Sequence, residues 1–120
     1  SNIFHTMRKI ETQMNMAIKS QKNWCSGNTQ VITDNGFSRV FLHGNHIANV
    51  FDDVVDGNVK KVVQLFDGGW QSNTTKSRLN AILFEFVTGF SVFQKNWEWF
   101  VSDFQGKNIV DFSNGISISE

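Results

Sequence analysis

The sequence has no proline, no tyrosine and a single cysteine, and its 11 basic residues balance its 11 acidic residues. One cysteine excludes an intrachain disulfide and fits a reducing compartment. A formal net charge of zero argues against a dedicated non-specific nucleic-acid binder, since such proteins are usually basic. The chain also lacks a long apolar run and a signal-peptide pattern, so we expect no membrane partner.

Aromatic residues are abundant, with 12 Phe and 4 Trp among 120 residues. Apolar residues make up 40% of the chain and charged residues 18%, which is typical of a globular protein. We predict a single domain over residues 1–120, in which a few large rings fill the core. Residues 1–6 are expected to lie outside the natural domain, with Met7 as a candidate start.

Two amphipathic helices are predicted from apolar periodicity. The first covers residues 2–21, and its stripe is formed by Ile3, Met7, Ile10, Met14 and Ala17. We expect this methionine-rich stripe to pack on the sheet of its own domain; the alternative is a partner-binding face or a homodimer seam.

The second helix follows the Gly68-Gly69 turn, with Thr74 or Thr75 as its N-cap and Gly89 as its stop. Its apolar face carries Leu79, Ile82, Leu83 and Phe86. Strand-like sequence lies on both sides of this helix.

Short strands are predicted before and after the second helix. Four of them, over 29–33, 39–43, 47–51 and 59–66, form a meander, and Asn35-Gly36 is a strong hairpin signal. Residues 52–58 are predicted as a connecting loop, 90–101 as one longer strand, 109–112 as a return strand and 116–118 as an edge strand. The fold class is therefore α+β: a two-layer domain with an antiparallel sheet of about six strands and two helices on one face.

The start of the second helix is a candidate binding site. Free backbone N–H groups, the polar residues Gln71 to Thr75, and the cations Lys76 and Arg78 could together hold an anion or a nucleic-acid phosphate. The alternative is an ordinary capped helix with a solvated basic edge, which the absence of a phosphate-loop glycine pattern favours. We predict binding roles for Gln71, Thr74, Thr75, Lys76 and Arg78, and also for His43 and Asn45.

A second candidate site surrounds the turn after the second strand. His43, Asn45 and His46 could serve a small enzyme. His43 and His46 could share a metal with Cys25, or Cys25 and His43 could form a nucleophile pair with an acid such as Asp34, but no local motif supports either chemistry. The simpler interpretation has surface histidines and a buried cysteine. The acidic residues 52–58 lack the ligand spacing of a calcium loop, so we predict no metal and no cofactor.

The segment from Phe93 to Phe100 mixes aromatic and polar residues. Trp97 and Trp99 with Lys95 could form a stacking platform for single-stranded nucleic acid if they lay on an open sheet face. The alternative, which we favour, places these rings in the core under the helices.

Several strings resemble a group of short uncharacterised proteins of tailed bacteriophages. The most specific are Leu42-His-Gly-Asn-x-Ile-Ala48 and Thr74-Thr-Lys-Ser-Arg-Leu-Asn-Ala81, and the similarity covers about residues 7 to 118. The resemblance implies a viral protein that is made in an infected bacterium and is located in the host cytoplasm. No activity is established for the group, so the resemblance assigns no catalytic residue.

We therefore predict a small phage accessory protein that acts by binding a host or phage macromolecule, without catalysis. An unidentified protein is the expected partner. The alternatives are a nucleic-acid-binding protein that uses Lys76 and Arg78, a small enzyme with a site at His43, Asn45 and His46, and a virion component.

Overall fold

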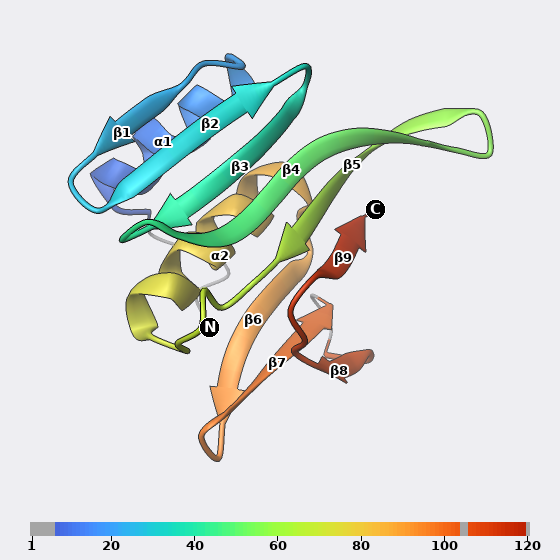
Figure 1. Ribbon diagram of the computed structural model, residues 1–120. Helices are drawn as coiled ribbons and strands as arrows, with labels where there is room; N and C mark the ends of the chain where they lie inside the picture. The colour runs from blue at the N-terminus through green and yellow to red at the C-terminus, as the bar shows by residue number, and fades with distance from the viewer. Residues whose placement is uncertain (1–6, 104–105, 120) are drawn as a thin grey trace.

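A computed structural model of the chain describes residues 7–103 and 106–119 (Figure 1). Within these ranges the elements are, in order, α1 (Lys9–Lys19), β1 (Trp24–Ser26), β2 (Thr29–Asp34), β3 (Phe37–Leu42), β4 (Asn45–Val55), β5 (Asn58–Leu65), α2 (Asn73–Phe86), β6 (Phe90–Lys95), β7 (Glu98–Asp103), β8 (Ile109–Asp111) and β9 (Ile116–Ser119).

The described strands form a larger and a smaller antiparallel sheet. The larger sheet has the order β1-β2-β3-β4-β5-β9, and the smaller has the order β6-β7-β8. Both helices lie on one face of the larger sheet, behind it in Figure 1, and α2 also packs against β6. The predicted α+β class with helices on one face is confirmed, with the smaller sheet as an addition.

Helix α1 turns its predicted stripe toward the core. Met14, Ala17 and Ile18 are buried, while Met16, on another face, is 61% exposed. The helix begins at Lys9, so the predicted start at residue 2 is wrong within the described range, and Ile3 lies outside the described residues. The methionine stripe is therefore used inside the protein, as the simpler interpretation expected.

Helix α2 begins earlier than predicted, with its N-cap two residues before Thr74 and three before Thr75. Ser72 is the N-cap, and its Oγ accepts a hydrogen bond from the Thr75 backbone N–H at 3.0 Å. Both predicted caps, Thr74 and Thr75, lie inside the helix, because any of the neighbouring polar side chains could have filled this position. The predicted apolar face is confirmed by the burial of Leu79, Ile82 and Leu83.

The meander is longer than predicted. Residues 24–26 form the additional strand β1, and the predicted loop 52–58 is a hairpin in which β4 and β5 continue to an Asp56-Gly57 turn. Strand β9 lies at an edge of the larger sheet, where it pairs with β5, as expected for residues 116–118. Acidic side chains near the hairpin end lower strand propensity, which is why the sequence suggested a loop there.

The predicted single strand over residues 90–101 is wrong. β6 and β7 form an antiparallel hairpin, in which Lys95 pairs with Glu98 across a turn made of Asn96 and Trp97. The alternation of apolar and polar residues conceals this turn in the sequence. Asn-Trp is not a recognised hairpin dipeptide, because tryptophan rarely adopts the positive φ that such a turn requires.

Candidate functional site

The turn between β6 and β7 differs from comparable turns of the larger sheet. In the described part of the chain, four two-residue hairpin turns have positive φ at both residues: Asn35-Gly36, His43-Gly44, Asp56-Gly57 and Asn96-Trp97. The second residue is glycine in the first three turns, with φ of 81°, 77° and 78°, and tryptophan in the last, with φ of 68°. Glycine takes this conformation without steric cost, whereas a bulky side chain does so only when its surroundings hold it there.

Trp97 gains no compensating burial at this turn. Its side chain is 89% exposed, and Trp70 in the loop before α2 is 78% exposed. Burial of a ring is the usual reason for an aromatic residue in a small domain. Backbone strain at an exposed aromatic residue therefore suggests a functional requirement.

Trp70 and Trp97 line one surface depression, which we call the tryptophan trough. Its central hollow, of about 370 Å³, is lined by Trp70, Gln71, Ser72, Asn73, Gln94, Trp97 and Trp99. Overlapping hollows extend it on one side to Lys76 and Asn96 and on the other to Glu98, Asp111 and Phe112. The trough thus combines the loop 67–72, the first turn of α2 and the smaller sheet.

Side chains from α2 fix the position of the β6–β7 hairpin. Asn80 Nδ2 donates to the Val92 carbonyl at 2.9 Å, and Asn80 Oδ1 accepts from the Val92 N–H at 2.7 Å. The asparagine pairs with β6 as a strand residue would, although it belongs to a helix. This contact holds the wall that carries Trp97 against the helix that carries Asn73 and Lys76.

The opposite wall is fixed by the loop that carries Trp70. Asp67 Oδ1 accepts a hydrogen bond from the Gly69 N–H at 2.7 Å, and the Asp67 N–H donates to Asn114 Oδ1 at 2.8 Å. Gly68, at φ 71°, lies so close to the β3–β4 turn that an added Cβ would be 3.1 Å from Asn45 Cβ. Only glycine permits both this conformation and this approach.

A neighbouring hollow brings together most of the remaining predicted site residues. It is lined by Leu42, His43, Asn45, Ile47, Gly68, Trp70, Ser72, Thr74 and Thr75. The β3–β4 turn and the start of α2, which the sequence suggested as separate sites, therefore face the same hollow. It shares Trp70 and Ser72 with the trough.

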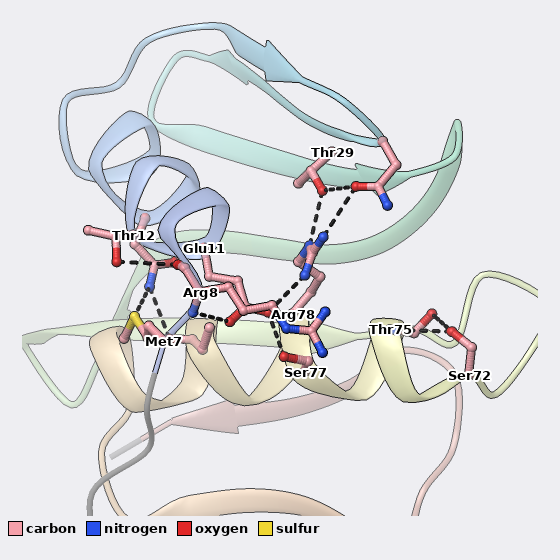
Figure 2. Close-up of polar contacts among 12 residues, drawn as sticks. Met7, Arg8, Glu11, Thr12, Thr29, Ser72, Thr75, Ser77 and Arg78 are labelled. Atoms are coloured by element: carbon pink, nitrogen blue, oxygen red, sulfur yellow. Dashed lines mark hydrogen bonds and ion pairs between the residues drawn. The ribbon is translucent and has the colours of Figure 1, made fainter.

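Arg78 is placed far from an open basic surface, which corrects the predicted solvated edge. Its side chain is 3% exposed, and its Nη1 lies 2.9 Å from Glu11 Oε2, itself completely buried (Figure 2). Arg78 Nε donates to Thr29 Oγ1 at 3.0 Å and Nη2 donates to Asn28 Oδ1 at 3.2 Å. Ser77 Oγ donates to the same Glu11 oxygen at 2.6 Å.

This network joins α1, α2 and the β1–β2 hairpin through one guanidinium group. The planar guanidinium can donate in several directions at once, which suits an ion pair inside a protein. Lys76, two residues earlier, lies about 200° around the helix from Arg78 and borders the trough instead. The two cations therefore do not form the joint basic patch that the sequence suggested.

His46 lies on the larger sheet's other face, away from His43 and Asn45. Its ring packs between Phe41 and Phe66, with centroid distances of 5.6 and 4.5 Å. Its Nε2 lies 2.6 Å from Asn49 Oδ1. The three residues predicted for an enzyme site are thus not brought together.

The remaining candidates are also separated. Trp99 is 3% exposed and packs edge-on against Phe112, so it cannot share an open stacking platform with Trp97. Cys25 is exposed, not buried as predicted, because it lies on the edge strand β1. Among the described residues, no group of three or more His, Cys, Asp or Glu side chains converges as metal ligands would.

A family model described as Kyanoviridae Gp96 protein matches residues 7–119. The chain belongs to this bacteriophage family. Membership confirms the tailed-phage resemblance seen in the sequence. No curated protein and no solved structure matches the chain. Across the described residues, α1 and α2 both fall short of the length and apolar character that a bilayer crossing requires.

Sequence reasoning missed Trp70, and the favoured core position was wrong for Trp97, which is 89% exposed, although it is correct for Trp99. One signal was available: Asn96-Trp97 follows β6 at the place where the other hairpins have an Xaa-Gly pair. Recognising it would have required the register of β6 and β7, which local sequence does not give. The trough offers bare indole rings beside amide groups, an arrangement suited to holding a ligand by stacking and hydrogen bonding.

Proposed function

We propose that this phage protein is a binding module that acts without catalysis, with the tryptophan trough as its contact surface. The supporting observation is Trp97, which occupies a turn position where glycine would be favoured and exposes 89% of its side chain. An exposed aromatic ring that contributes little to the core is typical of a binding anchor.

The rigidity of the surroundings supports the same proposal. Trp97 extends from a hairpin that Asn80 fixes to α2, and Trp70 lies beside Gly69, whose N–H bonds Asp67. A surface whose backbone is already fixed loses less conformational entropy when a ligand binds. The trough is therefore better suited to recognition than a mobile loop with the same residues.

The proposal places the protein in the cytoplasm of the infected host, where phage proteins are synthesised, with the virion as an alternative location. A host or phage macromolecule is the proposed partner. The neighbouring hollow with His43, Asn45, Thr74 and Thr75 would extend the same contact surface, since it shares Trp70 with the trough.

An affinity pull-down from lysate of infected cells tests this proposal. We expect the wild-type protein to retain a specific macromolecule and Trp97→Gly to lose it, because the variant removes the anchor but keeps a residue suited to the turn. Val59→Ala is the matched control, since Val59 is also exposed, at 70%, but lies on the β4–β5 hairpin.

The pull-down is carried out with and without nuclease, and protein, nucleic acid and carbohydrate are all analysed. Capture of the same macromolecule by wild type and Val59→Ala, with loss in Trp97→Gly, supports the trough. Equal capture by all three proteins would contradict it and would direct attention to the aromatic face of the larger sheet, where Phe37 and Phe51 stack at 5.0 Å.

A further inference from the structure

We infer that the trough binds an uncharged oligosaccharide, an inference that rests on the proposed function and specifies its ligand. The first observation is the exposure of Trp70 and Trp97, at 78% and 89%, on a shared hollow. The face of an indole ring carries negative electrostatic potential, which attracts the weakly positive C–H groups on the face of a sugar ring.

The amide side chains that line the trough are suited to hydroxyl groups. Gln71, Asn73, Gln94 and Asn96 are all exposed and line the trough or its extension. Each amide presents both donors and an acceptor. A sugar hydroxyl likewise donates and accepts, so a row of amides can pair with neighbouring hydroxyls without a fixed charge.

The charge of the trough favours a neutral ligand over a polyanion. Lys76 borders one end, but Glu98 and Asp111 border the other, and Lys95 lies opposite Glu98 in the hairpin register. A nucleic acid brings one negative charge per nucleotide, and its affinity depends on an excess of cations along the strand. Among the described residues that line the trough there is no such excess of cations, and Arg78 is paired with Glu11 in the interior.

The size of the depression fits several sugar rings. The central hollow of about 370 Å³ continues into one of about 460 Å³ at Asn73, Lys76 and Asn96. These volumes fall in the range of ligand sites in proteins, about 300 to 1,000 Å³. We therefore expect an oligosaccharide to contact both tryptophans.

Titration of the intact chain with defined probes tests this inference. The probes are the hexasaccharides of maltose, cellobiose and chitobiose type, and oligothymidine serves as the polyanion. We expect at least one hexasaccharide to change tryptophan fluorescence with an affinity that is insensitive to salt. Trp97→Gly is expected to weaken this binding by about ten-fold or more, and Val59→Ala to leave it unchanged.

Each outcome supports or overturns the inference. The inference is overturned if no hexasaccharide binds at a concentration of about 5 mM, because a weaker affinity would not be meaningful. If oligothymidine alone binds, loses affinity with salt and requires Trp97, the glycan inference is wrong but the trough remains the binding surface. If a hexasaccharide binds equally well to Trp97→Gly, the glycan inference is overturned, whereas the proposed function is still decided by the pull-down.

Discussion

The interface between α1 and α2 and the tryptophan trough use their side chains in opposite ways. At the interface, the charged groups of Arg78 and Glu11 are buried and bonded to each other and to neighbouring polar atoms. In the trough, large apolar rings and unburied amides face solvent. At the interface, charged groups that water would solvate are buried in the interior. In the trough, aromatic rings that could have filled a core remain on the surface.

This difference separates stability from recognition within one small protein. Residues of the interface should control the free energy of unfolding, since a buried charge without its partner is costly. Residues of the trough should control binding and contribute little to stability. Variants in the two regions should therefore have opposite patterns of effect.

The largest effect on stability is expected for Arg78→Ala. The substitution leaves the Glu11 carboxylate buried without its cation and should reduce the free energy of unfolding by about 3–5 kcal/mol. Lys76→Ala, two residues earlier in α2, is the matched control and should change it by about 0.5 kcal/mol or less. Urea denaturation followed by far-ultraviolet circular dichroism measures both values.

A small effect of Arg78→Ala, equal to that of Lys76→Ala, would show that the ion pair does not support the fold. The double variant Glu11→Leu with Arg78→Met sharpens the comparison. Because it removes both charges and supplies apolar volume, it should recover most of the stability that Arg78→Ala loses.

An intermediate effect is expected for Asn80→Ala, which lies between the two regions. Loss of the bonds from Asn80 to both backbone groups of Val92 should reduce stability by about 1–3 kcal/mol. Amide hydrogen exchange should accelerate more in β6 and β7 than in the larger sheet, since the hairpin loses its attachment to α2. Asn73→Ala, an exposed asparagine of the same helix, should leave the exchange rates unchanged; uniform acceleration across both sheets would contradict this account.

Much of the fold could be predicted from local pattern. The apolar face of α2 at Leu79, Ile82 and Leu83 follows the helical period, and the Asn35-Gly36 dipeptide predicts the hairpin that forms there. Features that depend on distant partners could not be predicted in this way. The separate smaller sheet and the attachment of β6 by Asn80 both depend on contacts between elements.

In the candidate site, too, the environment of single residues could not be predicted from local sequence. Lys76 and Arg78 are neighbours in sequence, but Arg78 continues the buried row that contains Thr75 and Ile82. A cation in such a row indicates a buried partner, yet Glu11 is 67 residues away and the sequence alone does not identify it. Trp97 was assigned to the core because its turn could not be recognised: its local conformation contradicts the usual preference of tryptophan.

The free energy of unfolding of Trp97→Gly, measured by urea denaturation beside the wild type, tests the central claim most directly. Relief of the positive φ should make the variant more stable by about 0.5–1 kcal/mol, although it loses a large side chain. The reciprocal control is Gly57→Trp, in a turn where an added Cβ meets no atom within 4 Å, and it should be less stable than wild type. If Trp97→Gly proved less stable than the wild type, Trp97 would serve the fold, and its proposed role as a binding anchor at an unfavourable turn would be contradicted.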